Sequence, residues 1–408
     1  MQTLHPILVV GGGISGITSA LELAEAGHSV ILLEKDPYLG GRVAQLHNYF
    51  PKMCPPACGL EINTRRLRSN PRIQYYTGAR VREVAGIAGN FSVRVSLDAR
   101  TITNRCTACG RCAEVCPIEP DPTTGHKAAY IPGGLAFPMK YTIDPGRCPG
   151  SSCAKCAEVC DFDAIHLEAQ PAEILLQVHR IIVATGWTPY DAKNLETYDY
   201  ADSADVITNL ELEGMLERAR LTGRSLLVPS TGNKPERVAF VQCAGSRDIR
   251  HLPYCSAVCC GVSLKQALTL AEKFPGIRTE IFYIDLRLGG RNEATLQKAE
   301  DCAGLTLTRG KVGKVTARKE GGLLVEAEDS TSGRMKREVF DLVVLATGMV
   351  PATGFPGLKR NEYGFAAADQ EEGIHPVALT KRPMDVASSV KDATAAALKS
   401  IREEEDHA

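Results

Sequence analysis

Eight cysteines lie between Cys106 and Cys160, and their spacing limits what the chain can fold into more than any other feature. The first group has the spacing C-x2-C-x2-C-x3-C-P and consists of Cys106, Cys109, Cys112 and Cys116. A cube of four irons and four sulfides needs three thiolates on one tight loop and a fourth from elsewhere. The first group therefore predicts an iron–sulfur cluster.

The second group departs from this spacing, because two extra residues follow its first cysteine and Asp161 replaces the proline. It consists of Cys148, Cys153, Cys156 and Cys160. Both groups end in Cys-Ala-Glu-Val-Cys, as an internal duplication would leave. In ferredoxins with two cubes, the fourth cysteine of each run serves the other cube. We therefore expect one [4Fe–4S] cluster on Cys106, Cys109, Cys112 and Cys160, and another on Cys148, Cys153, Cys156 and Cys116.

Two alternatives would also use these cysteines. Structural zinc usually takes two CxxC pairs and fits the observed order poorly. Buried free thiols are the other alternative. The 15 cysteines of the chain fit a reducing compartment better than a disulfide framework, because they cluster at ligand spacings.

The length, charge and composition of the chain argue against some classes of binding partner. A chain of 408 residues is expected to form two or three domains. Its formal net charge of −1 gives no electrostatic reason to bind nucleic acid or an anionic membrane surface. No apolar run is long enough to span a bilayer, and the N-terminus lacks the features of a signal peptide. We expect a cytoplasmic protein whose link to a membrane, if present, runs through a partner.

The N-terminus has the layout of a dinucleotide-binding fold. An apolar run at 6–10 precedes the sequence Gly-Gly-Gly-Ile-Ser-Gly at 11–16, a helical stretch follows, and the next strand ends in Glu34. Gly11 allows the tight turn, Gly13 lets a pyrophosphate approach the helix N-terminus, and Gly16 lets the helix pack on the strand. Glu34 can accept hydrogen bonds from ribose hydroxyls.

Three further segments favour flavin over nicotinamide. Gly40-Gly41-Arg42 follows the acid directly, as in flavoproteins with two dinucleotide domains. The sequence Ala-Thr-Gly then ends two apolar runs, at 184–186 and at 346–348, where such chains cross between domains. We expect FAD to contact Gly11, Gly13, Ser15, Gly16, Glu34, Lys35, Gly41, Arg42, Thr185, Gly186 and Gly348.

A third cysteine group replaces the expected second glycine turn. After the strand at 237–242, a second G-x-G-x-x-G would bind nicotinamide, but it is absent. In its place stand Cys243, Cys255, Cys259 and Cys260. Spacing alone leaves open a third cluster or a redox-active pair formed by the adjacent Cys259 and Cys260. Cys54, Cys58 and Cys302 have no assigned role.

The chain resembles the A subunit of heterodisulfide reductase over nearly its whole length. The resemblance rests on the segments GGGISG, CTACGRCAEVCP, YTIDPGRC, AFVQCAGSRD and YCSAVCCGVSLKQA. It implies that Cys243, Cys255, Cys259 and Cys260 hold a third [4Fe–4S] cluster close to the flavin. Residues 378–382 depart from the Ala-Gly-Cys turn that is usual in the family.

The resemblance implies an α/β fold with two dinucleotide domains, like thioredoxin reductase, and an inserted ferredoxin-like domain. We expect an FAD-binding domain at 1–99, the insert at 100–168, the return of the FAD domain with a linker at 169–234, a second dinucleotide-like domain at 235–345, and the C-terminal part of the FAD domain at 346–408.

Within this family the chain looks like the shorter relative, the A subunit of the quinone-interacting membrane-bound oxidoreductase of sulfate reducers. This implies an electron-transfer protein on the cytoplasmic side of the inner membrane, which exchanges electrons between the quinone pool and adenylylsulfate reductase. The implied partners are a second flavoprotein of the same kind and a haem-bearing membrane subunit.

Two other functions remain open at this point. One is a stand-alone NAD(P)H-dependent flavin disulfide reductase that uses Cys255, Cys259 and Cys260, although the missing second glycine turn argues against it. The other is a purely structural role, in which the clusters only stabilise a surface for assembly with other proteins.

Overall fold

The computed structural model describes residues 5–121, 125–352 and 354–405. Its first sheet is parallel and has the order β20-β9-β1-β2-β3. The strands are β1 (Ile7–Val10), β2 (Val30–Glu34), β3 (Ile73–Thr77), β9 (Ile181–Val183) and β20 (Ile374–Pro376). Its central strands read as unbroken apolar runs, because both faces of a parallel sheet are covered.

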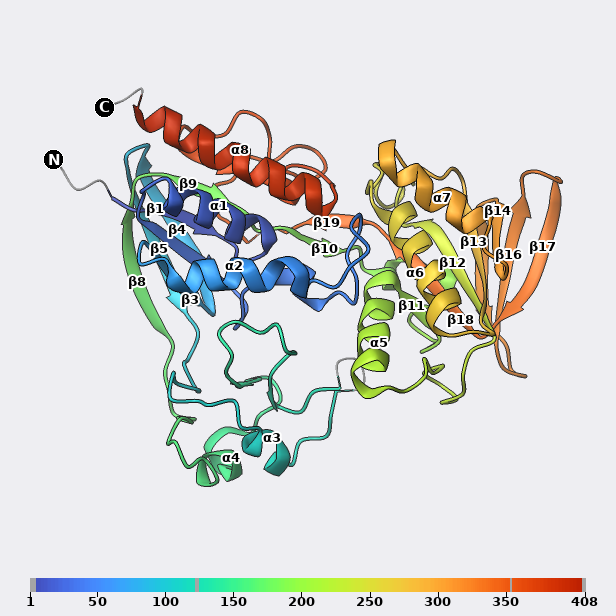
Figure 1. The fold of residues 1–408 in the computed structure, drawn as a ribbon, viewed down its shortest axis with the longest axis horizontal. Coiled ribbons are helices and arrows are strands. Elements are labelled where there is room, and N and C mark those ends of the chain that lie inside the picture. Colours follow the sequence, from blue (N-terminus) through green and yellow to red (C-terminus); the bar gives the residue numbers. More distant parts are fainter. Residues whose placement is uncertain (1–4, 122–124, 353, 406–408) are drawn as a thin grey trace.

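Helices cover one face of this sheet and a small antiparallel sheet covers the other (Figure 1). The helices are α1 (Ile14–Glu25), α2 (Ala57–Ser69) and the C-terminal α8 (Val386–Glu405). The antiparallel strands are β4 (Ala79–Ile87), β5 (Asn90–Leu97) and β8 (Ala172–Val178). Helix α8 lies along α1, where the Ser19 hydroxyl donates to the Ala393 carbonyl at 3.2 Å.

The region with the eight cysteines from Cys106 to Cys160 is inserted between β5 and β8 and lies below the first domain in Figure 1. It contains only short elements: α3 (Arg111–Val115), β6 (Ala129–Tyr130), β7 (Thr142–Ile143) and α4 (Lys155–Glu158). Its core consists of a few aliphatic side chains, such as Ile102 and Ile165, packed against the cysteines. With so small an apolar core, we expect this region to depend on bound metal for much of its stability.

The second domain repeats the plan of the first. Its parallel sheet, in the order β11-β18-β12-β13-β14, is formed by β11 (Val206–Thr208), β12 (Arg237–Ala244), β13 (Arg278–Tyr283), β14 (Leu305–Arg309) and β18 (Leu342–Thr347). The helices are α5 (Asn209–Thr222), α6 (Cys259–Lys273) and α7 (Glu293–Glu300). The antiparallel sheet is formed by β15 (Val312–Ala317), β16 (Leu323–Asp329) and β17 (Arg334–Phe340).

The second domain takes in more of the chain than we expected. Strand β11 and helix α5 lie in the stretch 169–234, which we assigned to the first domain and a linker, yet β11 pairs with β18. Clear local signals set this helix. Thr208 and Glu211 form a capping box at its start, and Gly223 ends it in the left-handed conformation.

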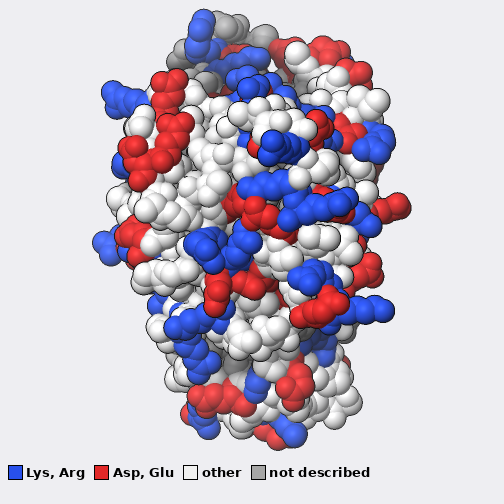
Figure 2. Space-filling model, turned by 90° about the vertical axis from the view of Figure 1, so that its right-hand side faces the viewer, with Lys and Arg blue, Asp and Glu red and all other residues white. Residues whose placement is uncertain are grey.

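Two crossing strands join the domains. β10 (Trp187–Pro189) leaves the first domain and pairs antiparallel with β19 (Met349–Pro351), which returns to it. Figure 2 shows the face formed by the second domain, where basic and acidic side chains are intermixed, as the net charge of −1 suggests. Among the described residues, no helix is both long and apolar enough to cross a bilayer.

Candidate functional site: a flavin turn and three cysteine groups

The glycine turn between β1 and α1 is built by close backbone packing. A Cβ on Gly11 would lie 2.3 Å from the Ala184 carbonyl oxygen, and one on Gly16 would lie 1.7 Å from the Gly11 oxygen. These two positions therefore need glycine for the fold itself. A Cβ on Gly13 would meet only the Gly41 Cα, at 3.9 Å, so space remains in front of the helix N-terminus. A pyrophosphate fits this place, because free N–H groups and the helix dipole favour an anion.

Glu34 lies at the end of β2 with its carboxylate against this turn. Glu34 is 5% exposed, and its carboxylate accepts hydrogen bonds from the backbone N–H groups of Gly12 at 2.6 Å and Asp36 at 2.9 Å. Each carboxylate oxygen has a further lone pair with which it could accept from a ribose hydroxyl. Burial raises the pKa of Glu34 to about 7 and outweighs the two backbone hydrogen bonds.

The pKa of Glu34 predicts a pH dependence of the cofactor-free protein. Between about pH 4.5 and 7 the folded state holds a proton that the unfolded state has released. The free energy of unfolding should therefore fall as pH rises through this window, by on the order of 3 kcal/mol if no other group compensates. Urea titrations of apoprotein across this range would measure it. Glu34→Gln should remove this slope, and an unchanged slope in that variant would contradict the assignment.

Six of the other seven residues predicted to contact FAD belong to the first domain, and the seventh, Gly348, belongs to the second. Ser15 is buried in the first turn of α1, and Lys35 is exposed just beyond Glu34. The Gly41 backbone lies against Gly13, and Arg42 reaches the crossing strand, where its Nε donates to the Trp187 carbonyl at 2.8 Å. The guanidinium also lies 5.2 Å from the centre of the Trp187 ring. Thr185 and Gly186 follow β9 after Ala184, beside the glycine turn.

Gly348 lies elsewhere. It follows β18 in the second domain, where a Cβ would come within 2.4 Å of the Ser246 hydroxyl and 2.5 Å of Leu252. The second Ala-Thr-Gly sequence therefore packs beside the third cysteine group, whereas the first one lies at the glycine turn between β1 and α1. The two sequences look alike because the two domains share one strand-and-turn plan.

The insert is tied to the first domain beside the glycine turn. The Tyr38 hydroxyl donates toward the carbonyl oxygens of Lys140 at 3.1 Å and Tyr130 at 3.3 Å. The next residue, Leu39, donates its N–H to the Phe137 carbonyl at 2.7 Å. Because these residues directly precede Gly40 and Gly41, the insert is anchored to the loop that faces the glycine turn. No sequence pattern marked Tyr38 for this role.

The cysteines of the insert surround two cavities. One, with about 340 Å³ of space including its open mouth, is lined by Cys106, Cys109, Cys112 and Cys160. The other, with about 320 Å³, is lined by Cys116, Cys148, Cys153 and Cys156. Each cavity thus has three cysteines from one run and the fourth from the other, which is the grouping that two cubes require.

Backbone geometry in the two runs supports this pairing. Gly110 and Ala154 both adopt the left-handed conformation one residue before the short helices that carry Cys112 and Cys156. The two extra residues after Cys148 form part of a short 3-10 turn (Gly150–Ser152), which leaves Cys148 at its cavity. Backbone N–H groups donate to the sulfurs of Cys106, Cys148 and Cys160, each at 3.4 Å. Such bonds adjust the potential of a cluster.

The lining of both cavities suits an iron–sulfur cube. Apolar side chains line both cavities, including Ile102 and Phe162 in one and Ile143 and Leu167 in the other. Burial raises the pKa of the Cys112 thiol to about 12, so a thiolate there needs a cation beside it. In the part of the chain that the structure describes, no group of three or more His, Cys, Asp or Glu side chains could hold one metal ion.

The third cysteine group lies at the corresponding turn of the second domain. Cys243 is at the end of β12 with a φ of +57°, and Cys259 and Cys260 begin α6. Burial and then the other thiols of the group raise the pKa of Cys259. The Cys255 sulfur accepts the Ala257 N–H at 3.4 Å. The four thiols therefore gather where a nicotinamide domain would have its glycines.

Together, the fold and these sites define a two-domain flavoprotein of the thioredoxin reductase type, with an inserted iron–sulfur domain. Thioredoxin reductases from T. acidophilum and Lactococcus lactis share the fold over 98% of both chains with a TM-score of 0.53, at 14% and 12% identity. Residues 6–70 match a family model described as FAD dependent oxidoreductase, and residues 99–120 match one described as 4Fe-4S binding domain.

Over nearly its whole length the chain is similar to A subunits of heterodisulfide reductases. It is 36% identical over 413 residues to the A subunit of the H(2):CoB-CoM heterodisulfide,ferredoxin reductase of Methanothermobacter marburgensis. It is 36% identical over 417 residues to the iron-sulfur A subunit of the CoB--CoM heterodisulfide reductase of Methanocaldococcus jannaschii. Each match covers 96% of this chain but only 62% and 63% of the relative. The predicted fold, the resemblance to heterodisulfide reductase A subunits, and FAD and iron–sulfur clusters as the kinds of cofactor are thereby confirmed, whereas the number of clusters stays a prediction.

Proposed function

We propose that this chain is an electron-transfer subunit in which FAD exchanges electrons with three [4Fe–4S] clusters inside a heterodisulfide-reductase-like complex. The observation that carries the proposal is the arrangement of the insert, where two cavities each combine three cysteines of one run with the fourth of the other. FAD accepts two electrons together and can release them one at a time, which suits a protein that joins pair and single-electron partners.

Groups of this chain would bind the FAD and adjust the potentials of the clusters. The space at Gly13 and the N-terminus of α1 would receive the pyrophosphate, and Glu34 would accept from the ribose. In the insert, N–H groups aimed at the sulfurs would stabilise added negative charge, and the apolar lining would keep water out.

The physiological partners are also part of the proposal. The relatives are named as subunits of heterodisulfide reductases, which supports a multi-subunit redox complex. From the resemblance to the proteins of sulfate reducers, we propose that this chain exchanges electrons between the quinone pool, through a haem-bearing membrane subunit, and adenylylsulfate reductase. A second flavoprotein of the same kind would complete the complex.

Affinity purification of the tagged chain from native membranes, without oxygen, tests this proposal. We expect a second flavoprotein and a haem-bearing membrane subunit to co-purify. The purified protein should show little flavin reduction by NADPH, because the second domain has cysteines where a nicotinamide site has its glycine turn. Rapid bleaching by NADPH with turnover of a disulfide would instead support a disulfide reductase.

A further inference from the structure

A buried ion pair lies where the two domains meet. Glu213 on α5 accepts a hydrogen bond from the Lys265 ammonium on α6, and their side chains are only 2% and 5% exposed. Gln266, also on α6, donates its Nε2 to the same carboxylate at 2.5 Å and to the Asn209 carbonyl at 2.8 Å. These contacts lock the two helices of the second domain together.

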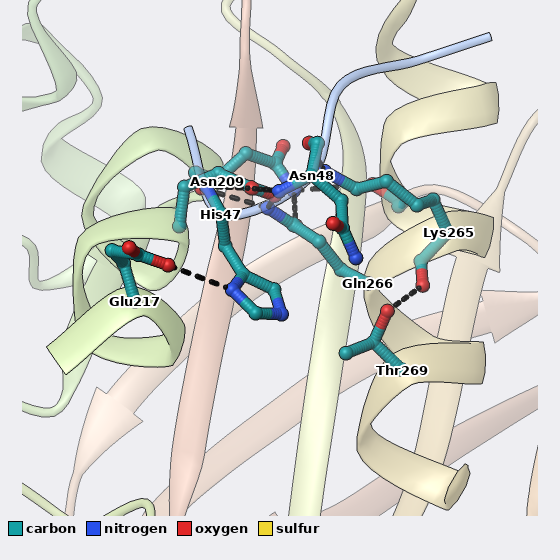
Figure 3. A network of polar contacts seen from close by, with 9 residues as sticks. His47, Asn48, Asn209, Glu217, Lys265, Gln266 and Thr269 are labelled. Atoms are coloured by element: carbon teal, nitrogen blue, oxygen red, sulfur yellow. Dashed lines mark hydrogen bonds and ion pairs between the residues drawn. The ribbon is translucent and has the colours of Figure 1, made fainter. Parts of the chain in front are cut away.

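The same carboxylate also binds a segment of the first domain, whose His47 and Asn48 are labelled in Figure 3. Glu213 accepts the backbone N–H groups of His47 at 3.1 Å and Asn48 at 3.3 Å. The Lys265 ammonium donates to the Asn48 carbonyl at 2.6 Å, and the His47 ring bonds Glu217 at 3.0 Å nearer the surface. Glu213 therefore receives four donors, two from each domain.

A close apolar contact continues this junction toward the cysteines. The ring of Phe50 packs on Gly261, where a Cβ would lie only 2.4 Å from two ring carbons. Gly261 is in the first turn of α6 and follows Cys260 directly. The segment from His47 to Phe50 thus touches both the middle of α6 and the turn that carries Cys259 and Cys260.

We propose that Glu213 is a positioning residue that fixes the third cysteine group against the FAD domain, so that flavin and cluster keep one separation. The chain crosses between the domains through the pair β10 and β19, and rotation about this pair would move α6 relative to the glycine turn. A buried ion pair adds little stability over an apolar contact of the same shape, but its hydrogen bonds fix geometry. This inference rests on the proposed third cluster.

Glu213→Gln tests the role, with Glu217→Gln as the matched control. The amide keeps the size of the side chain but removes the counter-ion of Lys265, whereas Glu217 is 30% exposed at the rim of the same network. In the holoprotein, hydrogen exchange at the His47 and Asn48 amides should quicken by about tenfold or more in Glu213→Gln. Electron transfer from flash-reduced flavin to the clusters should slow several-fold, with unchanged iron, FAD and midpoint potentials. Glu217→Gln should match the wild type in all of these.

A second pair of variants covers the case in which Glu213→Gln does not fold. Gly261→Ala should push Phe50 away and slow the same electron transfer, and adding Phe50→Leu should restore it by making room. Wild-type transfer rates and amide exchange in Glu213→Gln, or in a Gly261→Ala variant used in its place, would overturn the inference. A wild-type protein that lacks iron at the third group would instead refute the proposed cluster, and the amide exchange would still report on the junction.

Discussion

Replacing Gly13 by valine is expected to give a folded protein that retains less than about a tenth of the wild-type FAD. Gly13 has a φ of −75° and a ψ of −176°, an extended conformation that valine adopts without strain. A Cβ there would meet only the Gly41 Cα, so the side chain would instead fill the place of the pyrophosphate. The free energy of unfolding of the cofactor-free protein should stay within about 1 kcal/mol of wild type.

Two neighbouring changes sharpen this prediction. Gly16→Ala should destabilise the domain itself, because its Cβ would lie 1.7 Å from the Gly11 oxygen. Gly59→Ala, in helix α2 with no described atom within 4 Å of the added Cβ, should leave FAD content and stability close to wild type. Flavin absorbance after gel filtration, read beside urea unfolding, separates the cases. Normal FAD content in Gly13→Val would contradict the assigned binding mode.

The second large effect is expected from Cys160→Ala. Although Cys160 ends the second run, it lines the cavity of the first run with Cys106, Cys109 and Cys112. The variant should lose about four irons and the same cluster signal in electron paramagnetic resonance that Cys106→Ala loses. Cys116→Ala should remove the other signal, which belongs to the cavity of Cys148.

Cys302→Ala is the control, because Cys302 packs with the core of the second domain away from the three groups. Its iron content should equal that of the wild type. If Cys160→Ala removed the signal lost in Cys148→Ala instead, each run would bind its own cluster and the crosswise grouping would be wrong.

The sequence predicted best where chemistry ties residues together over short distances. The turn at Gly11 and Gly16 follows from local sterics, and the crosswise cysteine grouping follows from the shape of a cube. Both could be inferred without knowing how the domains pack. Gly348 was harder to place, because its Ala-Thr-Gly sequence is identical to the one at Gly186, and only tertiary structure distinguishes the two.

The junction between the domains could not be inferred from the sequence. Glu213 and Lys265 are 52 residues apart, and each reads as an ordinary polar residue of an amphipathic helix. Their burial depends on how α5 and α6 pack together and on a segment that arrives from the other domain. The boundary before β11 was missed for the same reason, since a three-residue strand has too weak a pattern to show which sheet it joins.

The cofactor content of anaerobically purified wild-type protein tests the central claim most directly. Iron, acid-labile sulfide and FAD should be measured on one sample. Three cubes beside one flavin predict about twelve irons and twelve sulfides per FAD. One iron or none per FAD would contradict the proposed electron-transfer function.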